Sequence, residues 1–310
     1  MNLLFVSKTN QIDIWKKSLE SKIPNLNFLT WSKDSDFQEK IDYALVWNPP
    51  PGQLHKLRGL KAILSLGAGV DGLLNDPELP NEIPIIRLVD HCLTKGMTEY
   101  VVYWTLFHHR QMAKYQQSIN SQEWTQLPQA NTREKKVGIL GAGELGRDAA
   151  QALNFLEFNV ATWSQSPKTI NGVTSFYGPS GLSSILKHSE ILICLLPLTE
   201  ETRGIINSKT LNQMSRGGVF INCARGAHVI DSDLLAALDS GQLKAATLDV
   251  FNDEPLQTSH PFWTKTNIFM TPHIASLTIP SSAAKRIAET IRIIESGERP
   301  AHEIDLIKGY

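Results

Sequence analysis

The sequence is poor in cysteine and lacks repeats, charge blocks and long hydrophobic runs. Its three cysteines, Cys92, Cys194 and Cys223, lie far apart among 310 residues. That spacing argues against a disulfide framework or a structural zinc site and fits a reducing compartment, so we expect no metal. The longest apolar run, 191–196, is far shorter than the ~20 residues of a membrane helix. The N-terminal apolar run is not preceded by basic residues as in a signal peptide, and we therefore expect a cytoplasmic protein without a membrane partner.

Positive and negative charges are nearly balanced. Lysine and arginine number 30 and aspartate and glutamate number 31, which gives a formal net charge of −1. This balance indicates no general attraction to nucleic acid, and we expect no nucleic-acid partner. Contents of 42% hydrophobic and 20% charged residues are typical of a soluble globular protein. At ~150 residues per domain, the length suggests about two domains.

Short apolar runs alternate with longer amphipathic stretches in the first part of the chain. This alternation predicts strands and helices that follow one another, and therefore a parallel sheet with helices on both faces. The helix-like stretches include 10–22 and 53–57. The predicted strands are 3–6, 27–29, 43–47, 62–66 and 85–88.

A second series of alternation follows a predicted helix over 98–119 and a polar, non-periodic stretch over 123–132. A further helix over 280–296 has an apolar face and is interpreted as a return to the first domain. The fold class is therefore α/β, with two doubly wound, Rossmann-like parallel-sheet domains and an active-site cleft between them. We expect a substrate-binding domain over 1–97 and 280–310 and a dinucleotide-binding domain over 98–279. The strands predicted for the second domain are 137–140, 160–163, 191–196, 219–222, 245–250 and 268–270.

A glycine-rich turn stands between a predicted strand and a predicted helix in the second domain. This context distinguishes a dinucleotide-binding turn from an ordinary glycine turn, which is the alternative. Gly141 permits the tight turn, Gly143 lets a pyrophosphate approach the backbone, and Gly146 lets helix and strand pack closely. The helix N-terminus would supply N–H donors to the phosphates. The turn consists of Gly141, Ala142, Gly143, Glu144, Leu145 and Gly146.

The end of the next predicted strand bears on the choice of cofactor. NAD sites usually place a carboxylate there for the ribose 2′-hydroxyl, about 20 residues after the glycine turn. This sequence has Ser164, Gln165, Ser166 and Lys168 instead, which would not repel a 2′-phosphate. The turn therefore favours NADP(H) over NAD(H), the alternative being a polar turn without selectivity.

Four residues with charged or titratable side chains follow strands of the second domain. Arg225, Asp249, Glu254 and His273 stand at or just past the ends of three predicted strands, where open α/β sheets bind ligands. Reduction of a 2-oxo acid needs a cation for the carboxylate and carbonyl and a proton donor for the new hydroxyl group. Arginine and a histidine held by a carboxylate are suited to these tasks. Each residue alone could equally serve packing or a solvated surface.

At these residues the chain resembles the D-isomer-specific 2-hydroxyacid dehydrogenases, and within them the glyoxylate/hydroxypyruvate reductase A group. The resemblance covers nearly the whole length. The motifs occur in the family's order and are more specific than the glycine turn alone. They are GAGELG, LLPLTEETRGIIN, NCARGAHVID, LLAALDSGQLKAATLDVFNDEPL and TPHIAS, and the group's own features include WNPP, SLGAGVD and the WS pair.

The resemblance implies roles for individual residues. Arg225 would orient the substrate and polarise its carbonyl group, Glu254 would pair with His273, and His273 would be the general acid. Asp249 would contact the nicotinamide amide. The other implied binding residues are Trp47 and the backbone N–H groups of Ala68, Gly69 and Val70 for the substrate, and Leu196, Pro197 and Ala224 for the cofactor.

The resemblance thus implies reduction of small 2-oxo acids, with glyoxylate and hydroxypyruvate favoured and NADPH preferred. Gln165 replaces the arginine that this group typically has after the WS pair, so NADH also remains possible. The alternatives are a dehydrogenase of another 2-hydroxy acid and a non-enzymatic dinucleotide-sensing protein of the same fold. A homodimer is expected through the helix that starts near Thr98. The apolar residues around this helix are Val101, Val102, Trp104, Leu106 and Phe107.

Overall fold

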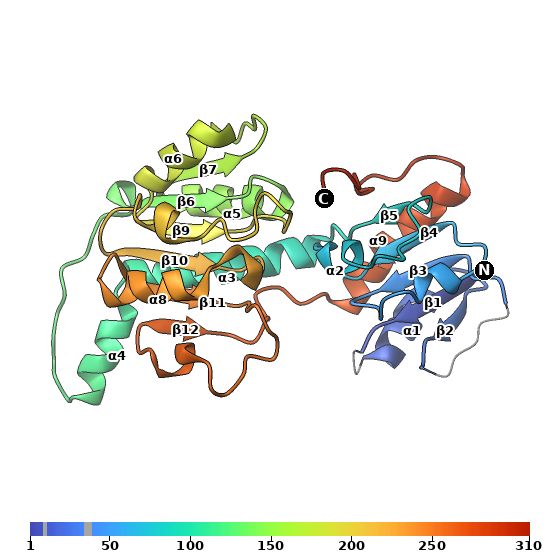
Figure 1. Ribbon diagram of the computed structural model, residues 1–310, viewed down its shortest axis with the longest axis horizontal. Coiled ribbons are helices and arrows are strands. Elements are labelled where there is room, and N and C mark those ends of the chain that lie inside the picture. The colour runs from blue at the N-terminus through green and yellow to red at the C-terminus, as the bar shows by residue number, and fades with distance from the viewer. Residues whose placement is uncertain (9–10, 34–38) are drawn as a thin grey trace. The chain divides into compact units, whose positions relative to one another are not determined.

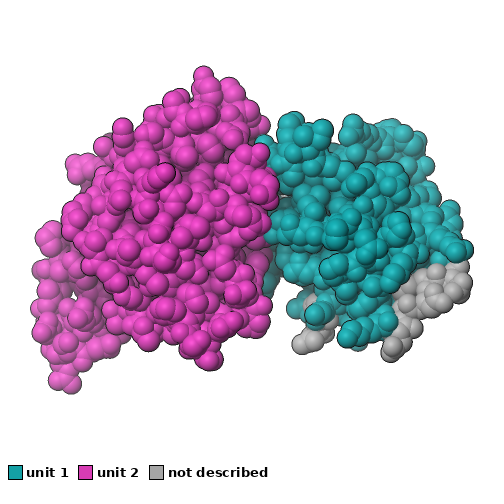
Figure 2. Space-filling model, in the orientation of Figure 1, with its two compact units in different colours: residues 1–93, 277–310 teal, residues 94–276 magenta. Residues whose placement is uncertain are grey.

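The computed structural model describes residues 1–8, 11–33 and 39–310. It divides into two compact units, in which unit 1 contains 1–93 and 277–310 and unit 2 contains 94–276 (Figure 2). Residues 94–97, which the sequence assigns to the substrate-binding domain, therefore belong to unit 2. Residues 277–279, which the sequence assigns to the dinucleotide-binding domain, belong to unit 1. The chain first passes from unit 1 to unit 2 inside helix α3 (His91–His109). A helix that continues across the boundary gives no signal of that boundary in the sequence. The predicted helix 10–22 begins at residue 10, which lies outside the described residues.

Unit 1 is built on a five-stranded parallel sheet in the order β2-β1-β3-β4-β5 (Figure 1). The sheet confirms the five strands predicted for the first part of the chain. Its central strands β3 and β4 are buried throughout, which explains their continuous apolar sequences. Helices α1 (Ile12–Glu20) and α2 (Asp71–Leu74) and a short 3-10 turn, η1 (Leu54–Lys56), belong to the same unit. The strands are β1 (Asn2–Val6), β2 (Asn27–Thr30), β3 (Tyr43–Val46), β4 (Ala62–Ser65) and β5 (Ile85–Ile86).

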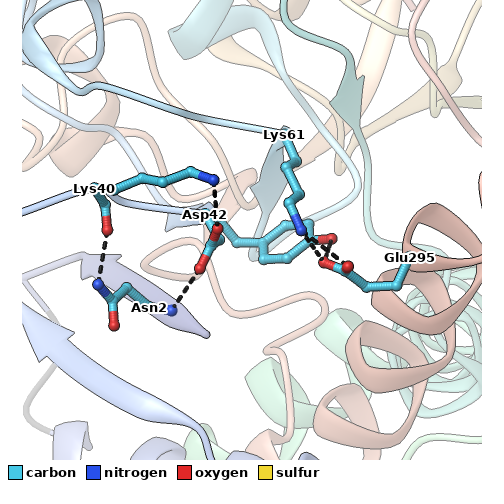
Figure 3. Close-up of polar contacts among 6 residues, drawn as sticks. Asn2, Lys40, Asp42, Lys61 and Glu295 are labelled. Carbon is cyan, nitrogen blue, oxygen red and sulfur yellow. Dashed lines mark hydrogen bonds and ion pairs between the residues drawn. The ribbon is translucent and has the colours of Figure 1, made fainter.

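Helix α9 (Pro280–Glu295) returns to unit 1, as the sequence predicts. Its apolar face, including Ala283, Ile287 and Ile291, is buried, and the helix packs on α1. Figure 3 shows how its last turn is tied to the sheet: the buried Tyr43 hydroxyl donates to Glu295 at 2.6 Å, and Lys61 Nζ pairs with Glu295 at 2.7 Å. The amino ends of β3 and β4 are therefore anchored to α9, at the edge of the sheet opposite to the carboxyl ends of the strands.

Unit 2 contains a seven-stranded parallel sheet in the order β12-β11-β10-β9-β6-β7-β8 (Figure 1). The six strands predicted for this domain are present. The sequence reasoning missed β8 (Thr174–Tyr177), an edge strand without a fully buried residue, because it lacks an apolar run. The other strands are β6 (Lys136–Leu140), β7 (Asn159–Ser164), β9 (Ile191–Cys194), β10 (Gly218–Asn222), β11 (Leu243–Leu248) and β12 (Ile268–Met270).

The single helix predicted over 98–119 is wrong in its extent, because the structure has two helices there. Helix α3 begins already at His91, and α4 spans Met112–Asn120. The break falls at Gln111, whose φ of 56° is left-handed and cannot continue an α-helix. The stretch 123–131 is free of helix and strand, as its polar composition predicts.

Helices flank the sheet of unit 2 and create two apolar cores, one on each face. Within the part of the chain that the structure describes, no helix is both long and apolar enough to cross a membrane. The helices that follow α4 are α5 (Glu144–Phe155), α6 (Gly178–His188), α7 (Ser208–Leu211) and α8 (Asp231–Asp239), with 3-10 turns η2 (Thr132–Glu134), η3 (Gly226–His228) and η4 (Pro261–Thr264).

Candidate active site

The glycine-rich turn connects β6 to the N-terminus of α5. Gly141 has a φ of 108°, and a Cβ there would lie 2.6 Å from the Leu195 carbonyl oxygen. A Cβ on Gly146 would lie 1.8 Å from the Gly141 carbonyl oxygen, so helix and strand approach too closely for any side chain. A Cβ on Gly143 would meet nothing within 4 Å. The open space at Gly143, at a helix N-terminus without a side-chain cap, fits the phosphates of a dinucleotide.

The remaining residues of the turn are placed around this backbone. Ala142 is buried, whereas Glu144 is exposed and Leu145 is half-buried in the first turn of α5. Leu196 follows β9 and its backbone N lies 3.2 Å from the position of a Cβ on Gly141. Leu196 and Ala224 are buried and Pro197 is exposed. The segments predicted to contact a cofactor thus follow β6, β9 and β10, which are neighbours in the sheet.

The turn after β7 carries the residues predicted to distinguish the two nicotinamide cofactors. Ser164 is the last residue of β7, and its hydroxyl donates to the Ser166 carbonyl oxygen at 2.8 Å. Gln165, Ser166 and Lys168 are exposed. The turn therefore presents hydroxyl, amide and ammonium groups to solvent, and no carboxylate lies among residues 164–168.

His273 and Glu254 form a hydrogen-bonded pair past the carboxyl ends of β12 and β11. His273 Nδ1 lies 2.7 Å from Glu254 Oε2. Burial acts to raise the pKa of Glu254, but the hydrogen bond from His273, the N–H of Phe251 and the charges of His273 and Arg225 outweigh burial and lower that pKa. Glu254 is therefore ionised and can only accept, so the proton of this hydrogen bond belongs to His273 Nδ1. Nε2 is the ring nitrogen left to exchange a proton with a substrate.

Arg225 lies in the loop after β10, with its charge close enough to Glu254 to lower the pKa of that carboxyl group. The guanidinium Nη1 donates to the Ala224 carbonyl oxygen at 2.6 Å. A Cβ on Gly226 would lie 1.9 Å from the Phe251 carbonyl carbon, so the Arg225 loop packs directly on the loop that carries Glu254. The structure thus brings Arg225, Glu254 and His273 to one edge of the sheet in unit 2.

Two residues that the sequence reasoning did not single out hold the Arg225 loop. The Asn222 side chain accepts from the Ala224 N–H at 3.1 Å and donates to the Arg225 carbonyl oxygen at 2.9 Å. His228 is fully buried, and its Nε2 lies 3.2 Å from the Pro197 carbonyl oxygen. In a neutral ring Nε2 therefore carries the proton, and Nδ1 accepts from the Arg225 N–H at 3.2 Å. Both residues belong to the NCARGAH motif. Asparagine and histidine as residue types do not show whether a side chain supports the loop or binds a ligand.

The residues predicted to bind substrate in unit 1 also lie together. A Cβ on Gly67 would lie 2.3 Å from the Trp47 ring, so the indole packs on the glycine loop that follows β4. Among the described residues, no hydrogen bond uses the N–H groups of Ala68, Gly69 and Val70. Three successive backbone N–H groups without a partner are suited to bind a carboxylate.

The chain is similar to a protein family and to curated relatives. The model of the D-isomer specific 2-hydroxyacid dehydrogenase NAD binding domain matches residues 102–275. Glyoxylate/hydroxypyruvate reductase A of Serratia proteamaculans is 41% identical over 315 aligned residues, which span 100% of both proteins.

Solved structures are similar over the whole length. A D-isomer specific 2-hydroxyacid dehydrogenase of Xanthobacter autotrophicus, in complex with NADPH and MES, has 39% identity and a TM-score of 0.96, covering 100% of this chain and 99% of that one. An NADPH-dependent glyoxylate/hydroxypyruvate reductase of Sinorhizobium meliloti, in complex with NADP and sulfate, has 35% identity and a TM-score of 0.93, with the same coverage.

The fold and the strand-end residues define a dinucleotide-dependent oxidoreductase of two α/β units. The chain belongs to the D-isomer specific 2-hydroxyacid dehydrogenase family. The family predicted from the sequence motifs is thereby confirmed.

Proposed function

We propose that this protein reduces small 2-oxo acids, glyoxylate and hydroxypyruvate above all, to 2-hydroxy acids with NADPH in the cytoplasm. The observation that carries the proposal is the His273–Glu254 pair at 2.7 Å, with the Arg225 charge acting on the same carboxylate. The names of relatives similar over their full length support the choice of substrates. A protein that only senses dinucleotides can keep the same three residues, so turnover of a 2-oxo acid distinguishes the two functions.

The reduced nicotinamide, when bound, supplies the hydride for the carbonyl carbon. Gly143 and the N-terminus of α5 would hold its pyrophosphate. Arg225 orients the substrate carboxylate and polarises the carbonyl oxygen through paired N–H donors. As that oxygen gains negative charge, His273 gives it the proton from Nε2, and the Glu254 carboxylate stabilises the protonated ring before transfer. The product is the 2-hydroxy acid, and solvent reprotonates His273 for the next turnover.

The test is consumption of NADPH by the purified protein with a panel of 2-oxo acids, followed at 340 nm. We expect turnover with glyoxylate and hydroxypyruvate and a lower kcat/KM with longer side chains, because Trp47 and the compact glycine loop suit a short substrate. Binding of NADPH without turnover of any 2-oxo acid would favour the dinucleotide-sensing alternative instead.

The cofactor preference should depend on the turn after β7. A charge-assisted hydrogen bond is worth about 1.5–3 kcal/mol, so one such bond to the 2′-phosphate favours NADPH by about tenfold or somewhat more. We expect Gln165→Arg to strengthen this preference and Ser164→Asp to reverse it, since a carboxylate repels the phosphate and accepts from the ribose hydroxyls. Dissociation constants for NADPH and NADH from fluorescence titration, together with kcat/KM, measure the effect.

Ser240→Asp is the control for the added negative charge. Ser240 is the C-terminal cap of α8 and precedes β11, so it lies at the amino ends of the strands, whereas Ser164 lies at the carboxyl end of β7. This variant should bind both cofactors like the wild type. Equal binding of NADPH and NADH by the wild type and by Ser164→Asp would mean that this turn does not contact the 2′-position.

We also propose that the protein is a homodimer through the α3–α4 region. Val101 and Trp104 face the core of unit 2, but Tyr103 is 58% exposed, and the apolar side chains of Met112, Ile119 and Trp124 are exposed as well. We expect light scattering at micromolar concentration to give twice the chain mass of 34.5 kDa. Tyr103→Glu should shift the mass toward the monomer, and a monomeric wild type would contradict the proposal.

A further inference from the structure

The backbone of His273 has a left-handed conformation. Its φ of 56° lies in the left-handed region, which is uncommon for a residue with a side chain. Its N–H donates to the Asp249 carbonyl oxygen at 2.8 Å. The direction of the imidazole therefore depends on the groups that fix this turn, and the Glu254 hydrogen bond fixes only the ring.

The Asp249 side chain clamps the turn on both sides of His273. Its carboxylate accepts from the Thr271 hydroxyl at 2.6 Å and from the N–H groups of Ile274 and Ala275 at 2.8 Å each. Asp249 is 1% exposed, so these hydrogen bonds are not in competition with water. A carboxylate has about four acceptor positions, so one remains for the nicotinamide amide that the family resemblance implies.

Tyr100 of α3 extends this arrangement by one more hydrogen bond. Its hydroxyl oxygen lies 2.6 Å from Thr271 Oγ1. Thr271 has one hydroxyl proton and gives it to Asp249, so Tyr100 must be the donor to Thr271. Burial raises the pKa of Tyr100, which keeps the phenol protonated and able to donate. The donors thus run in one direction, from Tyr100 to Thr271 to Asp249.

We propose that Tyr100 and Thr271 are positioning residues for proton transfer by His273. They orient the Asp249 carboxylate, and this carboxylate fixes the left-handed turn from which the imidazole projects. The kinetic part of this inference rests on the proposed function, whereas the hydrogen bonds themselves can be tested without any substrate.

Single substitutions separate positioning from simple stability. Tyr100→Phe and Thr271→Val each remove one hydroxyl from the series and should lower kcat about fivefold to tenfold, the range expected for one lost buried hydrogen bond. KM for the 2-oxo acid and the dissociation constant of NADPH should stay within about twofold. Thr271→Ser keeps the hydroxyl and should restore kcat to near the wild-type value.

The matched control is Tyr43→Phe. Tyr43 is also buried, and its hydroxyl donates at 2.6 Å to Glu295, far from the catalytic turn in sequence and within unit 1. Its loss should lower the melting temperature about as much as Tyr100→Phe does but leave kcat unchanged. A kcat at the wild-type level in both Tyr100→Phe and Thr271→Val would overturn the inference.

Amide hydrogen exchange at Ile274 and Ala275 gives a second measurement that needs no reaction. Both N–H groups should exchange several-fold faster in Tyr100→Phe and Thr271→Val than in the wild type, Thr271→Ser or Tyr43→Phe. Unchanged exchange would also overturn the inference. If the wild type reduced no 2-oxo acid, the proposed function would fail, and the exchange rates would still decide whether Tyr100 and Thr271 hold the turn.

Discussion

Replacement of His273 by glutamine should lower kcat by about 10²- to 10⁴-fold, the range that a positioned general acid contributes. Glutamine has no proton that it can transfer to the forming alkoxide, although its length resembles that of histidine. The variant should still fold and bind NADPH, because the His273 side chain is 37% exposed and contributes little to the core. Steady-state kinetics with glyoxylate, cofactor fluorescence titration and a melting curve measure these three properties.

Two further variants distinguish the loss of the imidazole from a disturbed backbone. His273→Asn introduces a residue that tolerates the left-handed φ well, so an equally low kcat in this variant assigns the effect to the missing proton donor. His188→Gln makes the same change at a histidine whose Nε2 lies 3.2 Å from the Asn159 carbonyl oxygen, at the start of β7. That control should behave like the wild type. Wild-type kcat in both His273 variants would remove His273 from the mechanism.

The order of elements could be predicted from the sequence because parallel strands buried on both faces are continuous apolar runs. Strands such as β3 and β9 are of this kind. The edge strand β8 escaped prediction because exposure permits a mixed sequence, TSFY. The break between α3 and α4 could not be predicted, because the surroundings of Gln111 impose its left-handed conformation. Glutamine as a residue type gives no local signal for such a conformation.

For the candidate site, the sequence predicts which residues come together but not the hydrogen bonds that hold them. Residues at strand ends must lie along one edge of a parallel sheet, so the grouping of Arg225, Glu254 and His273 follows from topology once the strands are assigned. The hydrogen bond from Tyr100 to Thr271 could not be predicted, because it joins residues 171 positions apart and depends on the packing of α3. Tertiary geometry also decides that three of the acceptor positions of Asp249 are occupied by the catalytic turn.

The geometry of Arg225 makes substitution by lysine severe, although the charge is kept. The guanidinium is planar and is fixed by its bond to the Ala224 carbonyl oxygen at 2.6 Å, so its remaining N–H groups point in set directions. The loop is rigid as well, because Asn222 holds the Arg225 carbonyl oxygen at 2.9 Å. A lysine ammonium group is a point charge on a flexible chain and cannot present two parallel N–H donors to a carboxylate.

We therefore expect Arg225→Lys to lower kcat/KM for glyoxylate by about 10- to 100-fold, which corresponds to one lost charge-assisted hydrogen bond of about 1.5–3 kcal/mol. KM should rise because the carboxylate is held less well, and kcat should fall because the carbonyl group is less polarised and less well aligned. Arg216→Lys is the matched control: Arg216 also donates to a carbonyl oxygen at 2.6 Å, that of Ser240, but ahead of β10 instead of after it. Cofactor binding should be unchanged in both variants. If Arg225→Lys retained wild-type kcat and KM while Arg225→Ala lost stability, the arginine would support the loop and another cation would have to bind the substrate.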